Sequence, residues 1–152
     1  MIQVRKLQPQ DLQYIYENAD ALSFVKEDML EKLEHMMVVL EGNEICGIGF
    51  CRMIEDLCLL NWVYIKEAHR RGSLGTMLVK TMLSNAEQQG AVLAYMQSCA
   101  EDFAEFLGFQ KITDARELTN AGELFIKGFG KEASEPLYKV SLIGYFKPCG
   151  RK

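Results

Sequence analysis

Two arginines and two glycines stand close together in the middle of the chain, in the stretch "HRRGSLGTML" from His69 to Leu78. Residues 66 to 80 include four basic residues and one acidic residue. A helix N-terminus leaves unpaired N–H groups with partial positive charge, and glycine lets an anion approach the backbone. The stretch therefore indicates a loop and helix start that bind a phosphate compound. A solvated basic turn is the alternative, because short glycine motifs recur by chance.

Two other phosphate-binding patterns do not fit this stretch. A P-loop requires a lysine after its second glycine, whereas Thr76 follows Gly75. A dinucleotide fingerprint needs three glycines after the first strand of the domain, and Gly72 and Gly75 supply only part of it far into the chain. The pattern that fits is an apolar strand ending at Ile65, a basic turn, and a helix that begins near Ser73.

Hydrophobic periodicity predicts the elements that position this loop. We expect strands over residues 2–7, 37–41, 44–53, 57–65, 91–96, 109–112, 124–129 and 137–145. We expect helices from Pro9 onward, over 73–89 and over 99–107, and a further amphipathic stretch on which Val25, Met29, Leu33 and Met36 share one face. This order predicts a mixed sheet with helices on both faces.

The composition is that of one globular domain over residues 1–152, with 49% hydrophobic and 25% charged residues. A net charge of −4 gives no support for nucleic-acid binding. The longest apolar run, residues 58–65, is too short to span a bilayer, and the N-terminus lacks the apolar core of a signal peptide. We therefore expect a cytoplasmic protein. Its five cysteines, without a C-x-x-C pair, predict reduced thiols and no metal site.

The stretch Val63–Leu83, "VYIKEAHRRGSLGTMLVKTML", resembles the acetyl-CoA-binding motif of the GNAT superfamily of N-acetyltransferases. Arg70 begins the family's R/Q-x-x-G-x-G/A pattern, Ser73 stands at its first glycine and Gly75 at its second. The segment from Gln97 to Ile112, "QSCAEDFAEFLGFQKI", resembles the family's N-x-x-A-x-x-F-Y-E-K-x-G-F pattern, with Gln97 in place of the asparagine. The resemblance covers residues 2 to about 112.

This resemblance implies the GNAT fold, a mixed central β-sheet of about six to seven strands flanked by about four helices. It implies acetyl-CoA in a cleft between strands 57–65 and 91–96, with its pantetheine arm along the backbone of 63–65 and its pyrophosphate on the amides of 70–76. The residues that it places against the cofactor are Val63, Tyr64, Ile65, Arg70, Arg71, Gly72, Ser73, Leu74, Gly75, Thr76 and Gln97.

The positions that carry proton transfer in the family differ in this chain. Ala104 stands where the family has a tyrosine acid, and the strand 57–65 has no acidic residue that could act as a base. The candidates that the sequence offers instead are Asn61, Tyr95 and Cys99, each with core packing as its alternative. Glu27, Asp28 and Glu31 could attract a cationic acceptor, or form a solvated helix face.

Two functions are therefore compatible with the sequence. One is an N-acetyltransferase that moves an acetyl group from acetyl-CoA to a primary amine on a small molecule or a protein. The other is a catalytically silent acyl-CoA-binding module that acts as a sensor or interaction subunit. The segment after Thr113 aligns only loosely with the family, and its two predicted strands could form the edge of a homodimer.

Overall fold

A computed structural model describes residues 1–17, 35–66, 73–130 and 132–146. They form a seven-stranded sheet in the order β1-β2-β3-β4-β5-β7-β6. The strands are β1 (Ile2–Lys6), β2 (Met36–Glu41), β3 (Glu44–Ile54), β4 (Leu57–Ile65), β5 (Leu93–Gln97), β6 (Gln110–Lys111) and β7 (Leu137–Ser141). The helices are a 3₁₀ turn (Pro9–Asp11), α1 (Leu12–Glu17), α3 (Leu74–Gln88), α4 (Glu101–Phe106) and α5 (Ala115–Phe129). Among the strands of the described residues, β4 and β5 are the one pair that runs in parallel.

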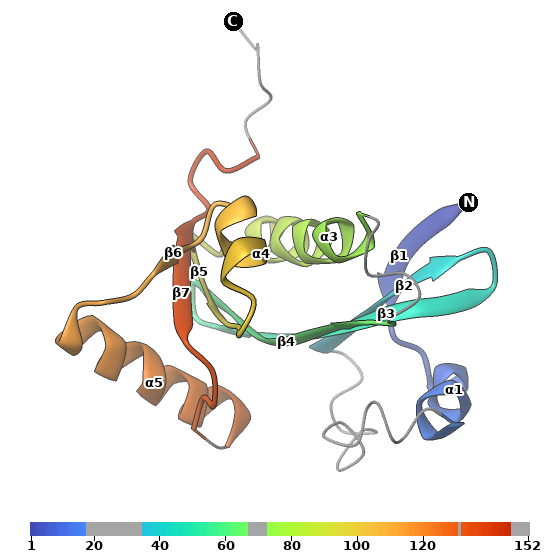
Figure 1. The fold of residues 1–152 in the computed structure, drawn as a ribbon, viewed down its shortest axis with the longest axis horizontal. Coiled ribbons are helices and arrows are strands. Elements are labelled where there is room, and N and C mark those ends of the chain that lie inside the picture. The colour runs from blue at the N-terminus through green and yellow to red at the C-terminus, as the bar shows by residue number, and fades with distance from the viewer. Residues whose placement is uncertain (18–34, 67–72, 131, 147–152) are drawn as a thin grey trace, which may run out of the picture.

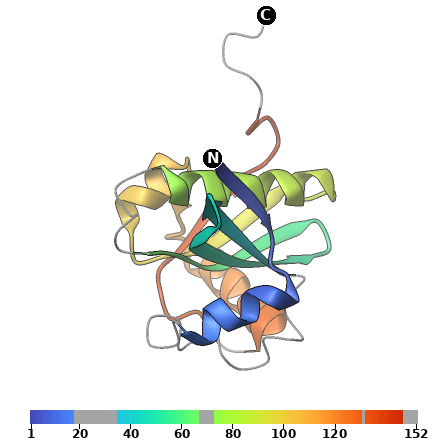
Figure 2. The same cartoon turned by 90° about the vertical axis from the view of Figure 1, so that its right-hand side faces the viewer.

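Helices cover both faces of the sheet, as the sequence predicts. Helices α3 and α4 lie on one face, and α1 and α5 lie on the other (Figure 1). The turned view shows α3 across the top of the sheet with α1 and α5 below it (Figure 2). The expected mixed sheet of six to seven strands with about four helices is therefore confirmed for the described residues.

Helix α3 packs closely on the sheet because β3 has a glycine beneath it. A Cβ built on Gly49 would lie 2.5 Å from the Sδ atom of Met82, which is 1% exposed in the core. Leu78, Val79 and Leu83 are completely buried on the same side of the helix. The helix ends before Gly90, whose φ of +103° is a left-handed conformation that glycine adopts without strain.

The strand predicted over residues 124–129 is wrong, because this segment is the second half of α5. Asp114 caps the helix by accepting a hydrogen bond from the Glu117 amide at 2.9 Å, and Gly130 ends it with a φ of +79°. The buried residues Ala121, Phe125 and Gly128 recur at helical spacing. A short apolar run does not distinguish strand from helix, whereas the two caps do.

Other predicted boundaries differ by a few residues. The predicted strand 137–145 ends at Ser141, and residues 143–146 form turns. The strand 109–112 is reduced to Gln110–Lys111, and helix 99–107 to Glu101–Phe106. Met36, expected on a helix face, begins β2 instead. The rest of that amphipathic stretch, including Glu27, Asp28 and Glu31, lies outside the described residues.

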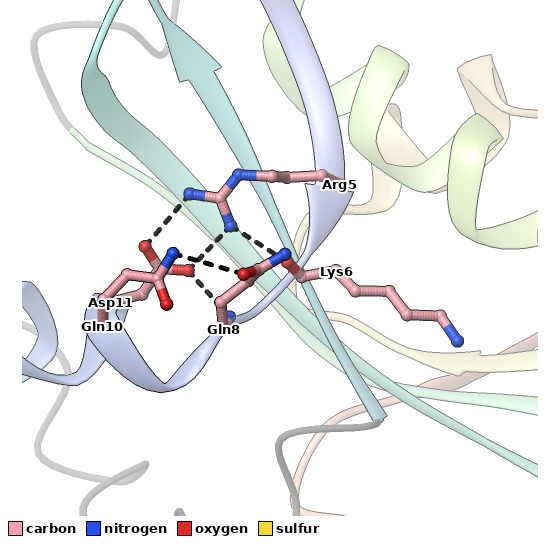
Figure 3. Close-up of polar contacts among 5 residues, drawn as sticks. All are labelled: Arg5, Lys6, Gln8, Gln10 and Asp11. Carbon is pink, nitrogen blue, oxygen red and sulfur yellow. Dashed lines mark hydrogen bonds and ion pairs between the residues drawn. The ribbon is translucent and has the colours of Figure 1, made fainter.

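The first strand is joined to the following turn by a partly buried ion pair (Figure 3). Arg5 donates two hydrogen bonds to the carboxylate of Asp11, at 2.8 and 3.1 Å, and the Gln8 amide donates to the same carboxylate at 2.8 Å. Burial by itself would raise the pKa of Asp11. The hydrogen bonds from Arg5 and Gln8 and the charge of Arg5 outweigh burial and lower the pKa below its ordinary value of 3.8.

We therefore expect Asp11→Asn to lower the free energy of unfolding by about 2 kcal/mol at pH 7. Because the folded-state pKa is lowered, this stabilisation is present above the unfolded-state pKa and is lost as pH falls through the folded-state pKa. Urea unfolding at pH 7 and pH 3 should show the difference between wild type and variant shrinking in acid. Asp56→Asn, in the exposed β3–β4 turn, is the control. An equal difference at both pH values would contradict the assignment.

Candidate functional site

Strands β4 and β5 separate before β4 ends. Their parallel ladder runs from the pair Leu57–Leu93 to the pair Leu60–Met96 and stops there, although β4 continues to Ile65. On the other side of β4, the register with β3 shifts between Phe50 and Cys51. We call the region beyond Leu60 and Met96, at the carboxyl ends of the two strands, the β4–β5 split.

Asn61 is the extra residue at this register shift. Its neighbours Leu60 and Trp62 pair with Cys51 and Phe50, so Asn61 forms a β-bulge in β4. Bulges increase the local twist and turn a side chain away from the regular alternation. The bulge therefore accounts for both the divergence of β4 from β5 and the position of a polar side chain, 7% exposed, at the split.

Gln97, the last residue of β5, contacts Asn61 across the split. The Gln97 Nε2 group donates a hydrogen bond to Oδ1 of Asn61. The Gln97 Oε1 atom accepts hydrogen bonds from the backbone amides of Ser134 at 2.9 Å and Glu135 at 3.2 Å. This network joins the bulge, the end of β5 and the segment that leads into β7.

The two backbone donors fix the orientation of both side-chain amides. Amide N–H groups require an oxygen acceptor, so Oε1 of Gln97 faces Ser134 and Glu135 and Nε2 faces Asn61. Asn61 must then present Oδ1 to Gln97. The Nδ2 group of Asn61 makes no hydrogen bond with the described residues. Every side-chain nitrogen or oxygen that is fully buried among these residues has a hydrogen-bond partner, so Nδ2 is not fully buried. Nδ2 is therefore an accessible donor beside the split.

Helix α3 begins shortly after β4 ends, as the sequence predicts. Its first i to i−4 hydrogen bond joins the Met77 amide to the Ser73 carbonyl at 2.9 Å. The amides of Leu74, Gly75 and Thr76 precede this bond, and such amides form the positive end of a helix. Arg70, Arg71 and Gly72, which the sequence also predicts for the cofactor, lie outside the described residues.

Gly75, at which the sequence predicts a close approach of an anion to the backbone, is the second residue of α3. A Cβ at this position would lie 3.4 Å from the ring of Phe103 and 3.5 Å from Ile65. Both distances are those of ordinary van der Waals contact, so the packing of α3 against α4 and β4 does not itself require a glycine here. The amide of Gly75 remains at the helix N-terminus, where it can still donate a hydrogen bond.

Residues 63–65 are the stretch that the sequence predicts to bind pantetheine. Their side chains alternate between the two faces of β4. Val63 and Ile65 pack in the core beneath α3, and Tyr64 packs in the cluster on the α1 side. Residues 63–65 pair with β3 along one edge, where Val63 is opposite Gly49. The ladder with β5 does not extend to these residues.

The other two catalytic candidates do not join the Asn61–Gln97 network. Tyr95 is 8% exposed and packs with Leu59 and Phe125 beneath α5. Its burial, and then the charge of Glu117, raise the pKa of its hydroxyl. Cys99 is exposed in the segment between β5 and α4.

Ala104 lies on the inner face of α4 and is completely buried. It lies in the core cluster with Leu107, Phe109 and Tyr138, and its exposed fraction is 0%. Tyr138, which sequence reasoning did not single out, is one of the largest fully buried side chains in the described residues. Its position in the run predicted as a strand from Leu137 was the available signal. Tyr138 of β7 therefore contributes aromatic volume to the core cluster that contains Ala104.

Within the described residues, no group of three or more His, Cys, Asp or Glu side chains is placed to hold a metal ion. The search of these residues for a helix long and apolar enough to cross a membrane also finds none.

Comparison with known protein families gives one match, to the family described as "Acetyltransferase (GNAT) family", over residues 1–109. The chain belongs to the GNAT family of acetyltransferases. The matched region ends between α4 and β6, so β6, α5 and β7 lie beyond it. A search of curated proteins finds no significant relative.

Solved structures share this GNAT fold. N-acetylglutamate synthase from Neisseria gonorrhoeae, complexed with coenzyme A and N-acetyl-glutamate, has a TM-score of 0.73 at 15% identity, covering 93% of this chain and 35% of the synthase. A GNAT acetyltransferase from Staphylococcus aureus has a TM-score of 0.72 at 14% identity, covering 93% and 99%. Rv2747 from Mycobacterium tuberculosis, in complex with CoA, has a TM-score of 0.69 at 15% identity, covering 92% and 99%. The chain thus spans about a third of the synthase and almost all of the other two proteins.

Proposed function

We propose that this chain binds acetyl-CoA at the β4–β5 split and transfers the acetyl group to a primary amine. The observation that carries the proposal is the split itself, with the Asn61 bulge at its side and the N-terminus of α3 following β4. Membership of an acetyltransferase family and the coenzyme A held by solved neighbours of the same fold support it.

The predicted contacts with acetyl-CoA are mostly with the backbone. The amides at the start of α3 would bind the pyrophosphate, assisted by Arg70 and Arg71, and the backbone of 63–65 would pair with the pantetheine arm. Such contacts depend on helix and strand position more than on side-chain identity. Ser73 in place of a family glycine is therefore compatible with binding.

The reaction forms a C–N bond and breaks the thioester C–S bond. The uncharged amine is the nucleophile. Its nitrogen loses a proton as the amide forms, and the sulfur of CoA gains a proton through water. Negative charge develops on the thioester oxygen, and an N–H donor placed there stabilises it. We assign this role to Nδ2 of Asn61, because Gln97 holds Oδ1 and leaves Nδ2 as the donor.

The second candidate, a silent acyl-CoA-binding module, is favoured by Ala104. This position is completely buried, and β4 contributes no carboxylate to the split. Calorimetric titration with acetyl-CoA, followed by a free-thiol assay over a panel of amines, separates the two functions. We expect binding and amine-dependent thiol release. Binding without release on any amine would favour the silent module, and absence of binding would exclude both.

We expect Arg70→Glu to weaken acetyl-CoA binding at least tenfold, because it replaces an attractive charge near the predicted pyrophosphate with a repulsive one. Calorimetric Kd values for wild type and variant provide the measurement. Arg116→Glu changes the charge equally on the exposed start of α5 and should leave the Kd unchanged. An unchanged Kd for Arg70→Glu would refute the phosphate-binding assignment.

A further inference from the structure

A groove of about 500 Å³ runs between α5 and the segment that leads into β7. We call it the α5 groove. Its described lining residues are Leu118, Thr119, Gly122, Glu123, Ile126, Glu132, Ala133, Glu135, Pro136 and Leu137. The α5 wall presents Leu118, Gly122 and Ile126 one helical turn apart, and the two apolar side chains are 40% and 45% exposed. This wall is therefore an apolar stripe interrupted by a glycine.

Gly122 keeps the middle of the groove open. A Cβ at this position would meet nothing within 4 Å, so packing does not require a glycine there. Gly128 in the same helix differs, because its Cβ would lie 3.0 Å from Leu59. Glycine inside a helix costs stability relative to alanine. Gly128 therefore allows the close contact between α5 and the sheet, whereas Gly122 borders the empty groove.

The charged residues among the described lining of the groove are all acidic. Three of its described lining residues, Glu123, Glu132 and Glu135, are acidic, and none is basic. All three are exposed, and their carboxylates form no ion pair or side-chain hydrogen bond among the described residues. Clefts lined by one sign of charge concentrate ligands of the opposite sign. The groove thus combines apolar walls with a field that attracts cations.

One end of the groove adjoins the β4–β5 split. Leu137 pairs with Gln97, and the carbonyl of Pro136 accepts a hydrogen bond from the Ser98 amide at 3.0 Å. The amide of Glu135 bonds to the Gln97 side chain, which in turn holds Asn61. A ligand in the groove therefore lies next to the network at which we place the reacting groups.

We infer that the α5 groove binds the acceptor and selects a linear amine that carries at least two positive charges on a methylene chain. This inference rests on the proposed function. The methylene chain contacts Leu118 and Ile126, and an ammonium group lies among the three carboxylates. The other end, as the neutral amine, attacks the thioester carbon and releases CoA as the thiol. The groove volume suits a small molecule.

Direct binding tests this inference without requiring catalysis. We expect spermidine to bind the protein in calorimetric titration at low ionic strength, and n-butylamine, a monoamine with a similar chain, to bind at least tenfold more weakly. The double variant Glu132→Gln/Glu135→Gln should weaken spermidine binding about tenfold. Glu87→Gln, which removes one exposed carboxylate at the end of α3, is the control and should change nothing.

A variant that fills the groove provides a second test of the inference. Gly122→Leu should abolish spermidine binding without lowering thermal stability, because the added side chain enters open space on a helix. Gly122→Ala is the matched control, which should stabilise α5 while leaving most of the groove open. Both variants should retain the wild-type affinity for acetyl-CoA.

The outcomes separate this inference from the proposed function. If acetyl transfer to monoamines occurs but spermidine binding is absent, or is unaffected by both Gly122→Leu and the double variant, the inference is wrong and the proposed function stands. If spermidine binds in the groove as expected but acetyl-CoA does not bind, the proposed function fails, and with it the acceptor role of the groove.

Discussion

Gln97→Glu is expected to lower kcat for acetyl transfer about 100-fold while the free energy of unfolding stays within about 1 kcal/mol of wild type. The glutamate keeps an oxygen for the amides of Ser134 and Glu135. Its second oxygen replaces Nε2, so Asn61 must turn its amide and donate through Nδ2. Oδ1 of Asn61 then faces the split, and the donor for the developing negative charge becomes an acceptor.

Two measurements distinguish this effect from a general loss of structure. Gln97→Leu removes every side-chain hydrogen bond of the network and should lower the free energy of unfolding by about 2 kcal/mol, because Asn61 loses its partner. Steady-state kinetics and urea unfolding on both variants separate the chemical effect from the structural one. Unchanged kcat in a folded Gln97→Glu protein would show that Asn61 Nδ2 does not contact the reacting group.

Ala104→Tyr, which introduces the tyrosine that the family resemblance predicts at this position, is expected to lower the free energy of unfolding by about 3 kcal/mol. Ala104 has no exposed surface, and Leu107, Phe109 and Tyr138 already fill the core around it. A tyrosine ring has room there only if α4 moves away from the sheet. The variant should therefore release no more CoA thiol than wild type.

Thermal unfolding and the thiol assay on purified Ala104→Tyr test this expectation. Phe106→Tyr, at a position on α4 that is 74% exposed, is the control for tyrosine on the same helix and should leave stability unchanged. A stable Ala104→Tyr variant with raised thiol release would show that α4 accommodates the ring. It would also show that a tyrosine acid at position 104 is the one group that wild type lacks for faster thiol release.

The sequence predicted β4 and α3 well because the signals for these two elements are local. A strand ending at Ile65 and a helix ending before Gly90 follow from hydrophobic period and from one helix-terminating glycine. The family motifs around Arg70 and Gln97 have fixed spacing along the chain, so no contact between distant residues was needed to find them. The family itself is confirmed over residues 1–109.

The α5 segment was mispredicted for a comparable local reason. The run from Leu124 to Phe129 is apolar and short, and its strand-like composition outweighed the caps at Asp114 and Gly130. With the helix missed, the α5 groove could not be expected, because its wall depends on the helical spacing of Leu118, Gly122 and Ile126.

By itself, the sequence determined the family, the order of the described elements as far as α4 and the stretch expected to hold acetyl-CoA. The tertiary structure decided which polar groups meet at the split. The bulge at Asn61 arises from the register between β3 and β4, and the partners of Gln97 come from Ser134 and Glu135, far along the chain. Periodicity reports which face of an element is buried, whereas cross-strand register and long-range hydrogen bonds form only when separate elements pack together.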